Sequence, residues 1–446
     1  MASTYLQRTL GTSTNTYKGT VSVWLKRSGL SSDQVIYGNY TSGTQRGKLV
    51  IAGDSKLMYY QNDGGVNTIK LETNRLFRDV GAFYHIVLSV DTTQATNSDR
   101  VKLYVNGVQE TSFNTATYPS QNTVFYLNAN SVTNYIGQEG NSSDYWDGSM
   151  SHFHFVDGTA YPASTFGETD ATTGEWKINT SPSITMGTNG FTILKDGNTI
   201  TDQSSNSNNF SLGGGTLTNT EDCPSNVFAT LNPLDVSRLA NTGNTFSNGN
   251  LTVTDGSSNY LVAQSTLAAT TGKFYWEVKI NATTSTSVSG VGVCDLDNFS
   301  RADGAANTAY GWIYAPDGDK RHNSSATAYG DTYAANDIIG IALDMTNGFL
   351  YFSKNGTWQN SGNPESGASG TNAAFGSISG TIGSHAYDGS SSQTHEYSFN
   401  FGNGFFGTTA VTTNSGNGYA SAEGSSIFNY QPPTGYSALS TKGLNL

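Results

Sequence analysis

Two distant parts of the chain share one strand–turn–strand pattern, and this pattern limits the possible folds more than any other feature. In the first part, residues 83–91 (FYHIVLSVD) are followed by a polar turn, Val101–Val105 and an Asn-Gly dipeptide. In the second part, Ile338–Asp344 is followed by a turn, residues 349–353 (FLYFS), a lysine and another Asn-Gly. Short apolar runs bounded by turns predict buried strands, and Asn-Gly accepts the positive φ angles of a tight hairpin. One antiparallel unit used twice predicts two β-sandwiches of related architecture.

The composition also favours an all-β chain. Charged residues make up only 13% of the sequence, against roughly 25% in an average soluble domain. Their place is taken by Ser, Thr, Asn and 51 glycines, which favour turns and strand ends over helices. The aromatic residues, at 12%, suit the half-buried face of a sheet. Since a single core stops growing near ~250–300 residues, a chain of 446 residues is expected to form two domains.

Charge, cysteine content and hydropathy exclude several classes of protein. The net charge is −12 and no basic cluster occurs, so nucleic-acid binding is not expected. Cys223 and Cys294 lie in different predicted elements, so no disulfide is expected, which suits assembly in a reducing cytoplasm. The first ten residues lack the apolar core of a signal peptide, and no run of 18 apolar residues occurs. We therefore expect neither a signal peptide nor insertion into a membrane.

The residue pattern divides the chain into three parts. Residues 1–170 and 246–446 each hold a set of predicted strands, and residues 171–245 form a polar bridge. The bridge still contains Trp176, Phe191 and Phe210, which a free linker would lack. We expect one or two short strands that dock on the first sandwich, followed by a crossover to the second. The predicted fold is therefore two antiparallel sandwiches joined by a short β-containing bridge.

Several motifs resemble known families. The stretch FYHIVLSVD…VKLYVNGVQ…YWDGSMSHFHFVDGTAY, within residues 1–170, resembles laminin-G/concanavalin-A-like domains. The stretch GKFYWEVKI…DIIGIALD…FLYFSKNG, within residues 246–446, resembles a SPRY domain, which is also a concanavalin-like sandwich. Four segments resemble structural proteins of marine tailed phages, notably those that infect cyanobacteria: residues 188–191 (TNGF), 204–210 (SSNSNNF), 228–234 (FATLNPL) and 428–439 (FNYQPPTGYSAL). This resemblance implies a virion protein that is assembled in the host cytoplasm and has other virion proteins as partners.

The sequence gives little support for catalysis. Some concanavalin-like sandwiches are glycoside hydrolases that use two or three carboxylates on one strand. The nearest candidates are Glu168, Asp170 and Glu175, but they are not in the tight alternation of those enzymes, and nearby glycines predict a loop. His152 and His154 have no cysteine near them, so we expect ordinary residues of a solvated or interface face instead of zinc ligands. No catalytic residue is predicted, and the protein is not expected to be an enzyme.

One pair of aspartates is a candidate for calcium. Laminin-G domains often bind calcium at a sheet rim through carboxylates and backbone carbonyls, as a hard cation requires. Asp144 and Asp147 flank Tyr145 and Trp146 and are placed to contribute. The alternative is that the two aromatic residues pack at the rim and the aspartates are solvated, and this alternative is favoured. No other cofactor is expected.

Sugar binding is the chemistry that the sequence favours. Sugars need aromatic faces for their C–H surfaces, and Asp, Asn or Gln side chains for their hydroxyl groups. Residues 310–323 (YGWIYAPDGDKRHN) supply both kinds of group, and the SPRY resemblance implies recognition by loops at one end of the sandwich. A core position for the tryptophan of this stretch is the alternative. The predicted ligand-binding residues are Trp312, Tyr314, Asp317, Arg321 and Asn323, with Tyr145 and Trp146 as a second candidate site.

Two classes of function follow from these observations. The first is a tail-fibre or appendage subunit of a virion that binds glycan or protein on the host surface. The second is an architectural subunit that decorates the capsid or builds a fibre and binds only other virion proteins. A polysaccharide depolymerase is less favoured because it requires a carboxylate pair. Phage fibres are commonly trimers, so a homo-oligomer is expected, although the chain has no heptads that would specify one.

Overall fold

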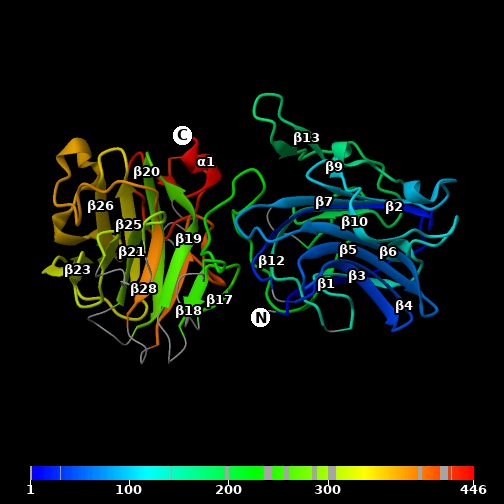
Figure 1. Ribbon diagram of the computed structural model, residues 1–446, viewed down its shortest axis with the longest axis horizontal. Coiled ribbons are helices and arrows are strands. Elements are labelled where there is room, and N and C mark those ends of the chain that lie inside the picture. Colours follow the sequence, from blue (N-terminus) through cyan, green and yellow to red (C-terminus); the bar gives the residue numbers. More distant parts are fainter. Residues whose placement is uncertain are drawn as a thin grey trace. The chain divides into compact units, whose positions relative to one another are not determined.

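The computed structural model divides the chain into two compact units, Met1–Asn219 and Thr220–Leu446 (Figure 1). It describes residues 3–30, 32–141, 143–195, 200–235, 244–255, 261–283, 289–299, 308–389, 394–411, 420–422 and 424–446. Almost all regular structure in these ranges is strand, with short 3-10 turns and one four-residue α-helix, α1 (Thr441–Leu444). The predicted all-β class is confirmed. Among the described residues, no helix is long and apolar enough to cross a membrane.

The first unit consists of two antiparallel sheets and a small hairpin. Their inward faces bury one apolar core, because alternate residues of each strand point to the same side. The larger sheet has the order β10 (Phe113–Thr117), β6 (Val66–Leu76), β5 (Lys56–Asp63), β4 (Gln45–Ile51), β3 (Gln34–Ser42), β11 (Thr133–Ile136), β1 (Tyr5–Thr9) and β16 (Ser211–Gly214). The smaller sheet has the order β15 (Phe191–Ile193), β12 (Gly148–Asp157), β2 (Lys18–Arg27), β7 (Tyr84–Asp91), β8 (Val101–Val105) and β9 (Val108–Gln109).

The hairpin predicted at the first Asn-Gly dipeptide is present. Strands β8 and β9 pair through Val105 and Val108. Asn106 and Gly107 have φ angles of 47° and 80°. These values match a tight turn whose twist suits the flanking strands. The local sequence alone therefore determines this connection.

Residues expected in the bridge contribute strands to the first unit. β15 pairs with β12, and β16 pairs with β1. β14 (Trp176–Ile178) forms a separate hairpin with β13 (Gly167–Thr169). Phe191 and Phe210 are buried, and their rings meet at 4.6 Å between centroids. The boundary between the two compact units lies at residues 219 and 220, inside the range 171–245.

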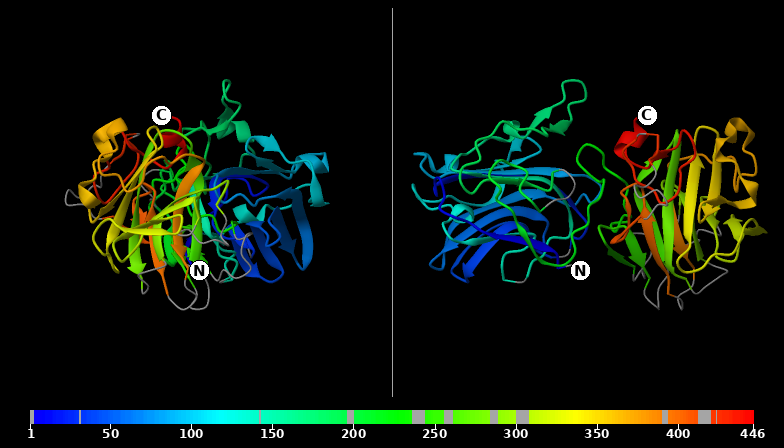
Figure 2. Two further views of the ribbon diagram at one scale, coloured as in Figure 1. Left: turned by 60° about the vertical axis from the view of Figure 1, so that its left-hand side comes forward. Right: turned by 180° about the vertical axis from the view of Figure 1, so that it is seen from behind.

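The second unit repeats the plan of two facing sheets (Figure 2). The larger sheet has the order β17 (Thr245–Ser247), β18 (Thr252–Thr254), β29 (Glu396–Asn400), β20 (Lys273–Ala282), β25 (Ile338–Asp344), β26 (Phe349–Lys354) and β27 (Thr357–Trp358). β32 (Ser437–Ala438) pairs with β20 in parallel. The smaller sheet has the order β19 (Leu261–Ala269), β28 (Ile382–Asp388), β21 (Ser289–Asp295), β22 (Gly311–Tyr314), β23 (Asp319–His322) and β24 (Ser325–Ala328).

The core of the second unit follows the predicted alternation along β20. Phe274, Trp276, Val278 and Ile280 all point into the same apolar cluster between the sheets. β30 (Phe405–Phe406) and β31 (Thr409–Ala410) form a separate short hairpin. Both cysteines are free, as predicted.

Candidate functional site

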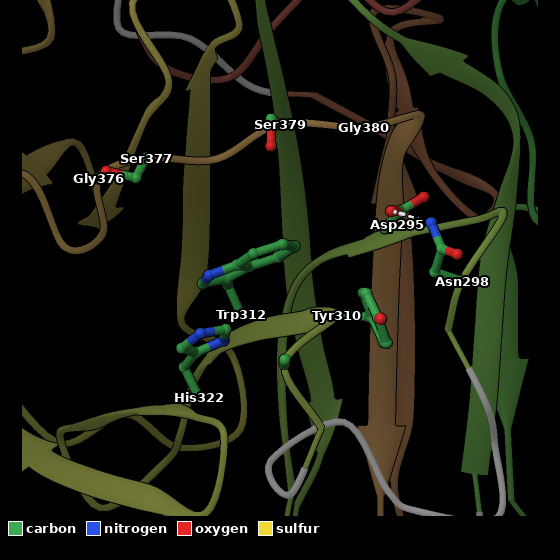
Figure 3. Close-up of a pocket in the computed structure, with 10 residues that line it drawn as sticks. Asp295, Asn298, Tyr310, Trp312, His322, Gly376, Ser377, Ser379 and Gly380 are labelled. Atoms are coloured by element: carbon green, nitrogen blue, oxygen red, sulfur yellow. Dashed lines mark hydrogen bonds between the residues drawn. The ribbon is translucent and has the colours of Figure 1, made fainter.

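The second unit carries a pocket of about 520 Å³ on its smaller sheet. Its walls come from three places in the chain: the end of β21 with the turn after it, the strands β22 and β23, and the loop that leads into β28 (Figure 3). The lining residues are Asp295, Asn298, Ala309, Tyr310, Trp312, His322, Gly376, Ser377, Ser379 and Gly380.

Aromatic rings form one side of the pocket. Strands β22 and β23 pair with Ile313 opposite Arg321, so Trp312 and His322 lie across from each other on the same face. Their rings stack at 5.0 Å between centroids with an interplanar angle of 8° (Figure 3). Trp312 is only 7% exposed and belongs largely to the core, whereas Tyr310 is 42% exposed. Tyr310 is therefore the aromatic side chain that is most available to a ligand.

The orientation of His322 defines an acceptor in this wall. Its Nδ1 lies 2.9 Å from the carbonyl oxygen of Gly311. A carbonyl only accepts hydrogen bonds, so Nδ1 carries the proton and the neutral ring keeps a lone pair on Nε2. His322 thus offers an acceptor, and its stacked partner Trp312 fixes the plane of the ring.

Polar groups form the opposite side. Asp295 is 4% exposed, and its carboxylate accepts hydrogen bonds from Asn298 Nδ2 at 2.8 Å and from the Asp297 amide at 3.1 Å. Gly380 has a φ of +116°, and a Cβ atom there would lie 2.6 Å from Asp295 Oδ2. Only glycine lets the loop pass this close to the carboxylate. The exposed Ser377 and Ser379 lie across from Trp312 (Figure 3).

The structure separates the residues of 310–323 that the sequence grouped together. Of the predicted ligand-binding residues there, Trp312 lines the pocket. The prediction for Tyr314 is wrong: its side chain is fully buried among Tyr329, Tyr333 and Phe352, and its hydroxyl donates to the Asp331 carbonyl. Burial also raises the pKa of Tyr314.

Asp317, Arg321 and Asn323 do not line the pocket. Strand alternation places Arg321 beside Ile313, on the face opposite to Trp312 and His322. The Arg321 guanidinium donates to the Asp317 carboxylate, so the two charges neutralise each other. Asn323 occupies the exposed turn between β23 and β24 with a φ of 49°. These three residues belong to β23 and the turns on either side of it, outside the lining of the pocket.

Nine of the ten lining residues were not among the predicted ligand-binding residues, and four of these nine carry the chemistry of the pocket: Tyr310, His322, Asp295 and Asn298. Tyr310 and His322 lie inside the stretch 310–323. If β22 and β23 are paired as a hairpin, His322 lies opposite Trp312, so this pairing is a signal that could have identified His322. Asp295 and Asn298 follow a predicted strand, yet nothing in the local pattern connects them with residues 310–322. The pairing of β21 with β22 brings them together.

The second predicted site, at Tyr145 and Trp146, is mostly packed. Trp146 is 8% exposed and belongs to the core of the first unit. Tyr145 is half-buried and lies 6.1 Å from the ring of Tyr5. The Trp146 indole packs at the rim of the core, as in the alternative interpretation of this segment, and neither residue lines the described pocket.

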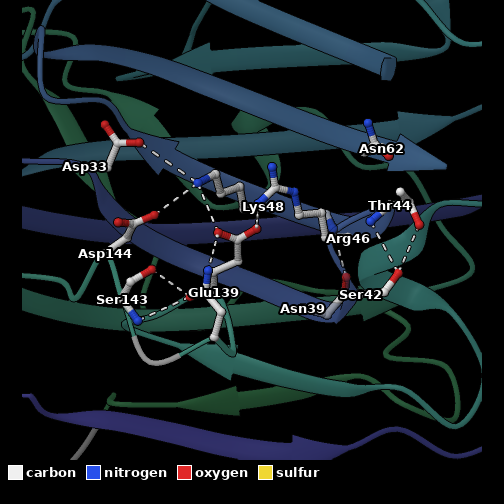
Figure 4. A network of polar contacts seen from close by, with 12 residues as sticks. Asp33, Asn39, Ser42, Thr44, Arg46, Lys48, Asn62, Glu139, Ser143 and Asp144 are labelled. Carbon is white, nitrogen blue, oxygen red and sulfur yellow. Dashed lines mark hydrogen bonds and ion pairs between the residues drawn. The ribbon is translucent and has the colours of Figure 1, made fainter. Parts of the chain in front are cut away.

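The candidate calcium ligands lie beside a network of opposite charges (Figure 4). Lys48 Nζ lies 3.2 Å from Asp144 Oδ2 and 3.2 Å from Glu139 Oε2, and Arg46 Nη1 lies 3.1 Å from Glu139 Oε1. The ammonium of Lys48 thus already neutralises Asp144. Burial raises the pKa of the Asp147 carboxyl, which disfavours the anion that calcium requires. The residues at this rim do not fit a calcium ion.

The carboxylates considered for hydrolysis lie around the β13–β14 hairpin. Asp170 pairs with Lys177 at 2.6 Å and accepts from the amides of Thr172 and Thr173, and these contacts lower its pKa. A carboxyl held as an anion is a poor general acid. Glu168 and Glu175 are exposed to solvent. The expected loop is therefore a hairpin in which Asp170 stabilises the turn.

The two neighbouring histidines of β12 are buried, where the sequence predicts a solvated or interface face. His154 Nδ1 lies 2.8 Å from Thr192 Oγ1, and burial lowers its pKa to about 3. His152 Nδ1 lies 2.7 Å from Ser151 Oγ, at an irregular register where the φ of His152 is 49°. Both side chains belong to the interior of the first unit.

Two protein families match the chain, each over one part of it. Residues 2–164 match the Concanavalin A-like lectin/glucanases superfamily, in its Laminin_G_3 group. Residues 273–404 match the SPRY domain. The two matched ranges lie in different compact units.

Several solved structures are similar to parts of the chain at low sequence identity and low TM-score. The SPRY domain of human HERC1 is 19% identical, covering 35% of this chain and 91% of that chain with a TM-score of 0.29. Domain 4 of AbnA, a GH43 extracellular arabinanase from Geobacillus stearothermophilus solved with arabinotriose, is 17% identical, covering 33% and 64% with a TM-score of 0.26. The heptameric SAP-like pentraxin from Limulus polyphemus is 16% identical, covering 35% and 71% with a TM-score of 0.27. The chain thus carries an N-terminal laminin-G/concanavalin-A-like β-sandwich and a C-terminal SPRY β-sandwich, folds compatible with binding carbohydrate or protein.

Proposed function

We propose that this protein is a non-enzymatic binding subunit of a tailed-phage virion whose pocket beside Tyr310 and Trp312 holds a sugar of a host-surface polysaccharide. The observation that carries this proposal is the pocket itself. It sets an exposed tyrosine and a stacked tryptophan–histidine pair against a buried, oriented carboxylate.

The chemistry of the pocket matches the two faces of a sugar. The C–H face of a pyranose packs on an aromatic surface, which Tyr310 presents. Its hydroxyl groups need both acceptors and donors. The Asp295 carboxylate and His322 Nε2 are acceptors, and Ser377 and Ser379 supply hydroxyls on the opposite loop. With a volume of about 520 Å³, the pocket is in the range of small-molecule sites.

The virion assignment rests on the resemblance of four segments to phage structural proteins, two of which, residues 228–234 and 428–439, belong to the second unit. In the second unit these segments lie side by side: the Ala229 amide donates to the Leu439 carbonyl at 2.9 Å, and Phe228 forms a bridge with Ser440. They thus belong to one structural element, which supports treating them as one signature. We expect other virion proteins as partners and a homo-oligomer that associates through sheet faces or edges.

Absence of catalysis is part of the proposal. Hydrolysis of a glycosidic bond needs two carboxyl groups that face the same bond. Asp295 is the only carboxylate among the described residues that line the pocket. Incubation with host polysaccharide is therefore expected to release no reducing sugar ends, and their release would contradict this part of the proposal.

Replacing Tyr310 with alanine tests the pocket. We expect Tyr310→Ala to weaken binding to cyanobacterial cells, and to lipopolysaccharide extracted from them, by about tenfold, or about 1.4 kcal/mol. Tyr310 is largely exposed, so its loss leaves the core intact, whereas truncation of Trp312 would also destabilise the fold. The measurement is a binding isotherm of the full chain by biolayer interferometry.

The matched control is Tyr17→Ala, at a tyrosine that is 36% exposed in the first unit. It is expected to bind like the unmodified protein. Equal binding by the Tyr310→Ala variant and its control would show that the pocket is not the sugar site. Absence of any cell or glycan binding would instead favour the architectural subunit.

A further inference from the structure

A second cluster of polar residues lies away from the pocket, in the same unit. Asp255 follows β18, and His395 precedes β29, its antiparallel neighbour, so the two residues face each other across the ladder. Asp388 is the last residue of β28, in the other sheet. The cluster therefore draws on both sheets of the sandwich.

The three side chains converge in the interior. One ligand atom from each, two carboxylate oxygens and an imidazole nitrogen, lie within 4.8 Å of one another. Asp255 is 5% exposed, and Asp388 and His395 are fully buried. Two carboxylates this close repel each other unless a proton or a cation lies between them. The two carboxylates therefore need either a shared proton or a bound cation between them.

The imidazole of the cluster has a buried nitrogen with no hydrogen-bond partner among the residues that the structure describes. His395 Nε2 is buried, and no described residue makes a hydrogen bond to it. Its approach to Asp388 Oδ2, at 3.5 Å, is too long for a good hydrogen bond. A buried nitrogen without a hydrogen-bond partner destabilises the folded state. A ligand that accepts its lone pair would remove this cost.

Neighbouring hydrogen bonds orient the imidazole of His395 and the carboxylate of Asp255. His395 Nδ1 lies 3.0 Å from the hydroxyl of the buried Tyr397, and the His395 amide donates to Asp255 Oδ1 at 2.6 Å. When Nδ1–H donates to Tyr397, Nε2 keeps a lone pair aimed at the two carboxylates. Histidines that bind metals are commonly held in this way through their second nitrogen.

We propose that Asp255, Asp388 and His395 bind a divalent transition-metal ion, and that zinc suits this donor set best. Zinc accepts imidazole nitrogen together with carboxylate oxygen, whereas calcium and magnesium prefer oxygen ligands alone. Two carboxylates balance the charge of the ion. The bound metal ties the two sheets together where β18, β28 and β29 meet and stabilises that end of the sandwich.

The test is zinc uptake by the full chain. The purified protein is stripped with a chelator, and Zn²⁺ binding is measured by equilibrium dialysis, with thermal unfolding in parallel. We expect one high-affinity zinc per chain and a rise of several degrees in Tm. His395→Gln and Asp388→Asn are expected to abolish both effects. Tyr397→Phe, which removes the hydroxyl that contacts Nδ1 and keeps the buried ring, is expected to weaken zinc binding by roughly tenfold.

The control is Glu365→Gln, at an exposed carboxylate of the same unit outside both the cluster and the pocket, and it is expected to take up zinc like the unmodified protein. Visible absorption of bound Co²⁺ reports the imidazole ligand independently of folding stability. The proposal is overturned if the stripped protein binds no zinc, or if His395→Gln and Asp388→Asn bind it as well as the control. In that case the cluster holds a shared proton instead of a metal.

Discussion

Replacing Glu277 with glutamine is expected to lower the free energy of unfolding of the second unit by about 3 kcal/mol. The carboxylate is fully buried in β20 and accepts four hydrogen bonds. Oε1 accepts from the Tyr430 amide at 2.7 Å and from the Tyr275 hydroxyl at 3.1 Å. Oε2 accepts from the Asn429 amide at 2.8 Å and from Asn400 Nδ2 at 3.2 Å.

Glutamine fits this site in neither orientation. A backbone amide points at each oxygen of Glu277, so the NH₂ group of glutamine would face a donor whichever way it turned. Burial raises the pKa of Glu277 to about 7, and the four donors oppose this shift because they favour the anion. The change therefore leaves buried donors unpaired and releases residues 429 and 430 from β20.

Urea denaturation followed by hydrogen-exchange mass spectrometry measures this loss, because it reports on each unit separately. Glu365→Gln is the matched control, since Glu365 is exposed and accepts from a single amide, that of Thr434. We expect the control to change the free energy of unfolding by less than about 1 kcal/mol. A Glu277→Gln variant as stable as this control would refute the proposed role of the carboxylate.

The second large effect is expected at Lys48 in the first unit. Its side chain is 9% exposed and contacts Glu139, whose side chain is 1% exposed. Removing one member of a buried ion pair strands the other charge, which costs about 3 kcal/mol or more. Lys48→Met keeps most of the apolar stem of the side chain. Glu139 then retains only its ion pair with Arg46, and Asp144 loses its ion pair with Lys48. We therefore expect a loss of about 3 kcal/mol in the first unit.

Lys70→Met provides the comparison for this variant. Lys70 pairs with Glu72 at 2.9 Å near the surface, with a side chain that is 30% exposed. Such pairs contribute about 0–1 kcal/mol, so this change is expected to be nearly neutral. The same exchange measurement reads both variants. If the two variants have the same urea midpoint of unfolding, the ion pairs of Lys48 with Glu139 and Asp144 do not stabilise the sheet.

Much of the fold could be predicted because its signals are local. The alternation of Phe274, Trp276, Val278 and Ile280 defines a strand with one buried face wherever that strand pairs. The Asn106-Gly107 turn likewise determines its hairpin through its own φ angles. Neither inference needs a contact between distant residues.

The candidate site could be predicted only in part because it depends on such contacts. Trp312 was found from its residue type, but Asp295 joins it through the pairing of two strands, and Gly380 through a loop that precedes a third. Tyr314 shows the opposite problem: it has the right chemistry, but strand geometry turns it into the core. Asp144 was a candidate calcium ligand by residue type. In the structure its carboxylate pairs with the ammonium of Lys48, which lies on a strand far away in the sequence.

Immunogold labelling of intact virions tests the proposed function most directly. Antibody against residues 220–446, the second compact unit, is applied to purified cyanophage particles and viewed by electron microscopy. The proposal predicts label on distal tail appendages, and bound soluble glycan should reduce it by covering the pocket. Label spread over the capsid or the proximal tail, unaffected by glycan, would contradict host attachment and make the protein an architectural subunit.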